Sequence, residues 1–139
     1  MTNKSKLRLC NWALPFLAVF ILLSSLHLEA TACRSTLWVW LHVAVGSLFF
    51  AFVLWHLRLH FPWGRWGSRL LLGPKRAVRW LTLFGLLALL SAMAATLFRL
   101  VQDCHSVVGG IHGKLGFVFL VLAVAHALVH HGYYRKSRL

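Results

Sequence analysis

The chain has 139 residues, of which 60% are hydrophobic and 12% are charged, and its formal net charge is +13. A soluble domain carries roughly 25% charged residues, so this composition excludes an ordinary soluble fold. The positive charge does not indicate nucleic-acid binding, because the chain has no polar domain that could present a basic face. Basic loops lying against an anionic membrane surface explain it instead.

Four apolar stretches follow one another along the chain, and each has about the 20 residues that a membrane-spanning helix needs. We expect helices at approximately 11–28, 37–57, 78–98 and 111–129. A longer basic loop, residues 58–77, separates the second helix from the third and is rich in Gly, Pro and Trp. The prediction is an all-α integral membrane protein with a single domain, residues 1–139, folded as an up-down-up-down four-helix bundle.

Positive charges near the helix ends predict the orientation of the bundle. Twelve of the fifteen Lys and Arg residues precede the first helix, follow the last one, or lie within or beside the 58–77 loop. The opposite side holds three basic residues and both acidic ones: Arg34, Arg99, Lys114, Glu29 and Asp103. The N- and C-termini and the basic loop are therefore expected to face the cytoplasm, with a bacterial inner membrane as the location.

The three cysteines lie near the predicted helix ends. Cys10 is expected to be a free thiol or to fill space at the cytoplasmic end of the first helix. Cys33 and Cys104 fall in the two external loops, where an oxidising environment makes a disulfide between them a candidate. Residues 30–32 also resemble a signal-peptide cleavage site, although the first apolar run has nearly full membrane length.

Nine histidines in so apolar a chain need an explanation, because a polar group without a partner in lipid costs several kcal/mol. Several of them belong to a pattern that recurs after 70 residues, once in the second expected helix and once in the fourth. Its members are His42, Gly46, His56 and His60 in the first copy and His112, Gly116, His126 and His130 in the second. An offset that spans two membrane crossings makes the two helices parallel and places equivalent residues at similar depth.

The spacing of fourteen residues places His42 and His56 on one helix face, about 21 Å apart along the axis. His112 and His126 have the same spacing. In an up-down bundle the second and fourth helices are diagonal, so these two faces can meet across the core. The pattern then gives one imidazole pair near each membrane surface, and two facing histidines are what a haem iron needs for axial ligation.

Small residues beside the histidines fit the same interpretation. Gly46 and Gly116, one turn after the outer histidines, would let a flat porphyrin approach the helix backbone. A ligating imidazole also needs an acceptor for its second nitrogen. Ser47 and Ser91 are candidates for that role.

Two parallel helices with histidines fourteen residues apart, second and fourth in a bundle, resemble the two-haem core of membrane b-type cytochromes. The cytochrome b of quinol-oxidising complexes is the best-known example, and the spacing is also similar to that of transmembrane ferric reductases. His112, Gly113 and Gly116 resemble the start of the last helix in small bacterial four-helix cytochrome-b-like domains. The resemblance covers about residues 37–131.

This resemblance implies two non-covalent b-type haems, each held by two axial histidines: His42 with His112, and His56 with His126. His60 and His130, one turn further along, are alternative ligands. A pair eighteen residues beyond the outer histidines would lie about 27 Å deeper, which spans most of a roughly 30 Å hydrocarbon core. We therefore interpret His60 and His130 as interfacial residues near the haem propionates.

Electron transfer is the chemistry that two axial imidazoles favour, because they close both faces of the iron, and no catalytic residue is assigned. The sequence has no dinucleotide fingerprint and no P-loop. Electrons are therefore expected to pass to and from a membrane quinone, separate redox proteins or other subunits of a complex. The chain is interpreted as an electron-transfer protein or as a subunit of a membrane oxidoreductase.

Two other classes of function stay open. A His-lined metal-ion or proton transporter would use the same side chains, but it predicts carboxylates within the spans, and both acidic residues lie at helix ends. A haem-free membrane assembly subunit explains the hydrophobicity and the charge. It does not explain the 70-residue repeat.

Overall fold

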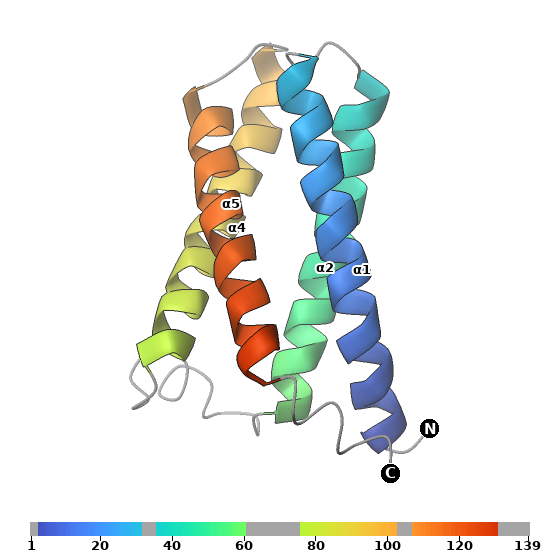
Figure 1. Cartoon of the computed structure of the whole chain (residues 1–139). Coiled ribbons are helices and arrows are strands. Elements are labelled where there is room, and N and C mark those ends of the chain that lie inside the picture. The colour runs from blue at the N-terminus through green and yellow to red at the C-terminus, as the bar shows by residue number, and fades with distance from the viewer. Residues whose placement is uncertain (1–2, 32–35, 61–75, 103–106, 131–139) are drawn as a thin grey trace. The chain divides into compact units, whose positions relative to one another are not determined.

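A computed structural model describes residues 3–31, 36–60, 76–102 and 107–130, and these ranges form α-helices with no strand among them (Figure 1). The helices are α1 (Asn3–Ala30), α2 (Thr36–His60), α4 (Arg76–Gln102) and α5 (Val107–Val129). Each contains a stretch long and apolar enough to cross a membrane, of 26, 25, 22 and 23 residues in chain order. The predicted all-α class with four membrane-length helices is confirmed, and the chain is a multi-pass membrane protein.

Three of the helices extend clearly beyond the apolar stretches from which they were predicted. Helix α1 begins at Asn3 rather than near residue 11, α4 ends at Gln102 rather than near 98, and α5 begins at Val107 rather than near 111. Hydropathy marks only the part of a helix that lies in hydrocarbon. The backbone continues its helical hydrogen bonds into the interface, where long basic side chains reach water.

Helices α1 and α2 pack as an antiparallel pair. Near one end of the pair the Cys10 thiol donates to the carbonyl oxygen of Phe52, at 3.3 Å. Towards the other end Ser24 Oγ lies 2.8 Å from His42 Nδ1. The residue nearer the start of α1 thus contacts the residue nearer the end of α2, and the reverse holds at the other end. This is the register of two antiparallel helices joined by a short connection.

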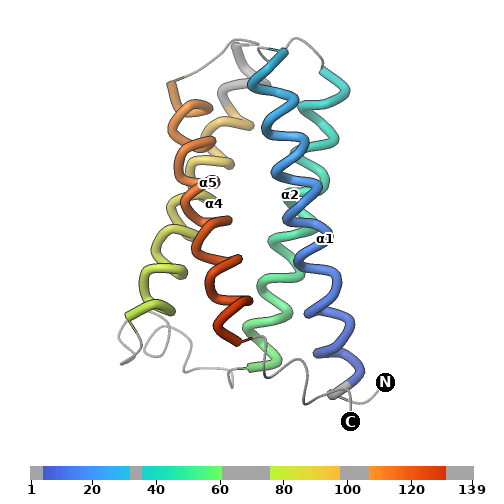
Figure 2. The backbone as a smooth tube through the Cα atoms, in the orientation of Figure 1, coloured from blue at the N-terminus to red at the C-terminus, as the bar shows by residue number. Residues whose placement is uncertain are grey.

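Helices α4 and α5 form a second antiparallel pair, and both pairs can be followed along the backbone in Figure 2. Ser91 Oγ lies 3.3 Å from His112 Nδ1. Further along, Gly85 approaches Phe119 so closely that a Cβ on the glycine would lie 2.9 Å from Phe119 Cε2. Glycine therefore permits this contact between the two helices.

Small residues occupy the most buried positions of the described chain. Cys10 is 0% exposed and Ser24 is 1% exposed, and Ala88 is also buried. Large apolar side chains face outward, such as Phe16 at 70% and Leu128 at 69% exposure. This is the pattern of helices in lipid, where small residues allow backbones to approach and large ones meet acyl chains.

The chain divides into two compact units. The first contains α1 and α2 within Met1–Trp66, and the second contains α4 and α5 within Gly67–Leu139. Each unit is thus one helical hairpin with an up-down path. That the two hairpins form a single domain stays a prediction.

Candidate functional site

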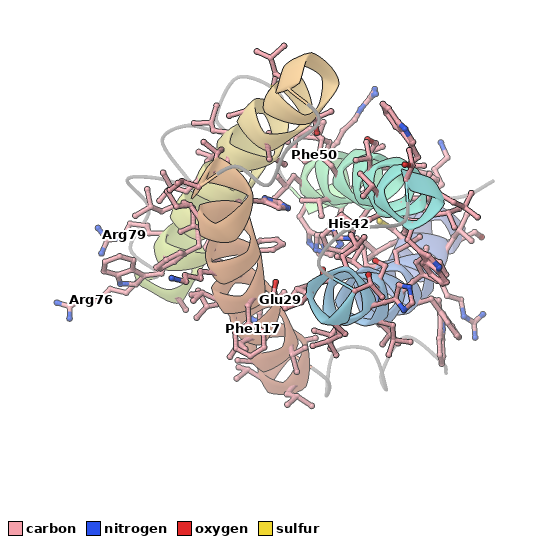
Figure 3. The ribbon with its side chains drawn as sticks, turned by 90° about the horizontal axis from the view of Figure 1, so that it is seen from above. Glu29, His42, Phe50, Arg76, Arg79 and Phe117 are labelled. Atoms are coloured by element: carbon pink, nitrogen blue, oxygen red, sulfur yellow. The ribbon has the colours of Figure 1, made fainter. Side chains whose placement is uncertain are left out.

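His42 is held against α1 by a serine of that helix. The imidazole, labelled in Figure 3, is half-buried on α2. Its Nδ1 lies 2.8 Å from Ser24 Oγ. The Ser24 hydroxyl donates its hydrogen to the carbonyl oxygen of Ile21, at 2.9 Å. A hydroxyl has one hydrogen, so when Ser24 donates to Ile21 O its oxygen accepts from a protonated His42 Nδ1; the direction of this contact follows the tautomer of the ring.

His112 has a matching environment in the second hairpin. This imidazole is half-buried on α5, and its Nδ1 lies 3.1 Å from the carbonyl oxygen of Ala88 and 3.3 Å from Ser91 Oγ, both on α4. The Ser91 hydroxyl donates to the same Ala88 carbonyl, at 2.9 Å. A carbonyl oxygen can only accept, so His112 Nδ1 carries a hydrogen as well.

The two outer histidines therefore have matching contacts at Nδ1. In a neutral imidazole with its hydrogen on Nδ1, the lone pair lies on Nε2. Metal-ligating histidines almost always donate their other ring N–H to an acceptor in the protein, which fixes the tautomer and the ring orientation. His42 and His112 both make the hydrogen bond that this role requires.

The inner histidines share a different arrangement. The His56 and His60 rings are neighbours on α2, with centroids 4.5 Å apart and an interplanar angle of 50°. The His126 and His130 rings at the end of α5 repeat this contact at 4.6 Å and 56°. In each pair the first histidine is half-buried and the second is exposed. That His60 and His130 lie at an interface stays a prediction.

Gly46 and Gly116 have open surroundings. A Cβ built on either glycine meets no atom within 4 Å, whereas one built on Gly85 meets the Phe119 ring. Packing of the described helices therefore explains Gly85 but not the two glycines of the repeat. Open space beside the outer histidines suits the approach of a flat, bulky group, so these glycines fit the haem that the sequence predicts.

The structure corrects one of the two candidate acceptors. Ser91, one of the two candidates, lies beside His112, whereas Ser47 is exposed and donates to the carbonyl oxygen of Val43 on its own helix, at 2.8 Å. His42 has a serine of α1 as its partner instead. Sequence reasoning missed Ser24, the partner that His42 has. The feature that could have identified Ser24 is a hydroxyl side chain within an otherwise apolar stretch.

The cysteines divide between described and undescribed parts of the chain. Cys10 is a free, buried cysteine, as predicted. Cys33 and Cys104, the candidates for a disulfide, both lie outside the described residues.

No three His, Cys, Asp or Glu side chains gather into a metal-binding group within the described ranges. Axial ligation of a haem needs only two histidines, and the predicted pairs draw one from each hairpin. Comparisons of the chain with family models, with curated proteins and with solved structures find no match. The resemblance to membrane b-type cytochromes therefore depends on the histidine pattern alone.

Proposed function

We propose that this chain is a di-haem b-type membrane cytochrome that moves electrons across the bilayer. The observation that carries the proposal is the matched placement of His42 and His112. Nδ1 of each ring lies within hydrogen-bond distance of an oxygen on the preceding helix of its own hairpin. Donation from Nδ1 to that oxygen would leave the lone pair on Nε2, which is what a ligand role requires of both repeat-related imidazoles.

The proposed ligand pairs are His42 with His112 and His56 with His126. Helices α2 and α5 are each the second helix of an antiparallel hairpin. If every helix crosses the membrane once, α2 and α5 run in the same direction and place equivalent histidines at equal depth. Gly46 and Gly116 would give the outer haem its approach to the two backbones.

The chemistry supported by this ligand set is electron transfer. A bound haem supplies a one-electron change between ferrous and ferric iron. The histidines of this chain would occupy both axial positions and so keep substrate and oxygen away from the metal.

The proposed location is a bacterial inner membrane, with a quinone, redox proteins or other subunits of a complex as partners. Arg76 and Arg79 extend outward from the first turns of α4, at the end predicted to be cytoplasmic (Figure 3). Together with the basic 58–77 loop they would meet anionic lipid or an acidic partner at that surface.

Substitution of single histidines tests the ligand pairs. We expect His42→Ala or His112→Ala to remove one of two haems selectively, and His56→Ala or His126→Ala to remove the other, because one imidazole cannot replace a bis-histidine site. The measurement is haem content per polypeptide, with optical redox titration to tell which haem remains.

The matched control is His27→Ala. His27 stacks on Trp38 at a centroid distance of 4.4 Å and is outside the repeat, so both haems should persist. Equal loss of both haems in all four ligand variants would contradict the pairing. A wild-type chain that binds no haem would contradict the function itself and would favour the metal-ion or proton transporter.

A further inference from the structure

We propose that Ser24 and Ser91 are positioning residues that fix the tautomer of His42 and His112 and strengthen Nε2 of each as an iron ligand. The first part concerns the protein without any cofactor. The second part rests on the proposed function. Neither serine belongs to the 70-residue repeat that identified the histidines.

The case for Ser24 comes from counting hydrogens. Its hydroxyl has Ile21 O as an acceptor at 2.9 Å, and with the hydrogen placed there the oxygen 2.8 Å from His42 Nδ1 accepts from the ring. Ser24 is 1% exposed, so water cannot replace it readily as an acceptor. A serine that is this well buried and already satisfied by its own helix presents a fixed acceptor to the ring.

The case for Ser91 combines two acceptors. Its hydroxyl donates to Ala88 O, and His112 Nδ1 lies within reach of both oxygens, at 3.3 Å and 3.1 Å. The serine and the carbonyl together hold the Nδ1 hydrogen on the side of α4. Ala88 is among the buried residues, so this acceptor pair lies inside the hairpin contact.

The two serines reach their histidines by different routes. Ser24 precedes His42 by 18 residues, whereas Ser91 precedes His112 by 21. A shift of 70 residues carries Ser24 onto Ala94 and Ser91 onto Ile21, so copying of the repeat cannot account for both contacts. Two hairpins of different register thus place a hydroxyl oxygen at the same atom of equivalent histidines, which is the reason to assign the contact a role.

The expected consequence is a stronger ligand. Donation from Nδ1 to an acceptor increases the electron density on the imidazole and the basicity of Nε2, and loss of such a partner typically weakens metal binding 10- to 100-fold. A more basic imidazole stabilises ferric iron more than ferrous iron. Removing the acceptor should therefore raise the midpoint potential of the outer haem.

The first experiment needs no haem. Nitrogen-15 NMR of the histidine rings in haem-free, detergent-purified protein distinguishes a protonated Nδ1 from an unprotonated one, and His42→Gln assigns the His42 signals. We expect a protonated Nδ1 in the wild type and a mixture of tautomers at His42 in Ser24→Ala. Ser47→Ala is the matched control, because Ser47 lies on the same helix as His42 and bonds only to Val43 O. An unchanged His42 tautomer in Ser24→Ala would overturn the proposal.

The second experiment uses the haem-loaded chain. Ser24→Ala and the similarly sized Ser24→Cys, whose sulfur is a weak acceptor, should both raise the outer haem potential, while Ser47→Ala should leave it unchanged. The shift should correspond to up to about tenfold in the oxidised-to-reduced ratio, which is 59 mV for a one-electron couple. Ser91→Ala should give a smaller shift, because Ala88 O still accepts at 3.1 Å.

The two experiments separate the two proposals. A wild type that binds no haem contradicts the proposed function, while the tautomer measurement still tests the serines. A wild type with two haems whose outer potential is the same in Ser24→Ala and Ser24→Cys would overturn the ligand-strength half of the inference. Retention of the wild-type potential in Ser91→Thr, which keeps the hydroxyl that Ser91→Ala removes, would support that half.

Discussion

Glycine serves two different purposes in these helices. At Gly85 the absence of a side chain allows close helix contact, because a Cβ there would lie 2.9 Å from Phe119 Cε2. At Gly46 and Gly116 a Cβ would meet nothing within 4 Å. The hairpin contact explains the first glycine, and we propose that the other two leave room for a haem.

Gly85→Ala is expected to destabilise the α4–α5 hairpin. The added methyl group must displace the Phe119 ring, and overpacking of this kind typically costs about 1–3 kcal/mol. The change can be measured by unfolding the purified protein with increasing SDS. Phe119→Leu in the same chain should restore part of the lost stability, and an unaltered unfolding curve for Gly85→Ala would contradict the contact.

Gly46→Leu and Gly116→Leu should affect haem binding rather than stability. We expect unfolding to be nearly unchanged, because both positions are open, whereas the outer haem should bind several-fold more weakly because the leucine occupies its approach. Gly110→Leu is the control, since Gly110 is equally open but lies outside the repeat. Full retention of both haems in the two repeat variants would show that these glycines do not border the cofactor.

At the scale of single residues, the sequence predicted the histidines better than their partners. A spacing of fourteen and an offset of 70 depend only on helix geometry along one chain, so His42 and His112 could be identified directly. Their serine partners depend on the register between two helices, which the connection sets. Separations of 18 and 21 residues in the two hairpins follow no common rule, and Ser47 was therefore selected where Ser24 was the partner.

At the scale of the elements, hydropathy predicted the number and order of the helices but not where they end. The start of α1 at Asn3 lies among polar and basic residues that an apolar window ignores. The antiparallel pairing of α1 with α2 and of α4 with α5 follows from connections too short for any other path. The two helices of each hairpin approach closely at small buried residues such as Cys10 and Ala88. Hydropathy does not distinguish these residues from small ones that face lipid.

The packing of α1 on α2 can be tested through Cys10. Its thiol is fully buried and donates to the Phe52 carbonyl oxygen, so we expect a water-soluble maleimide to label it at least tenfold more slowly in the folded protein than after unfolding in SDS. The experiment uses a chain in which Cys33 and Cys104 are replaced by serine. Rapid labelling of folded protein would show that this helix contact is open.

For the whole molecule, the charge distribution and the 70-residue repeat predict the orientation in the membrane and the direction of α2 and α5. Twelve of fifteen basic residues on one side predict cytoplasmic termini, and if each helix crosses the membrane once, α2 and α5 run in the same direction. We propose that the His42 and His112 faces then hold one haem and the His56 and His126 faces another. Each hairpin would contribute half of every ligand pair.

The most direct test of this account is the haem content of the wild-type chain. The detergent-purified protein, expressed with ample haem supply, is assayed by pyridine haemochrome and by a reduced-minus-oxidised spectrum, quantified per polypeptide. We expect two b-type haems per chain, low-spin in both redox states, because two histidines would hold each iron. A chain that folds and carries no haem would contradict it.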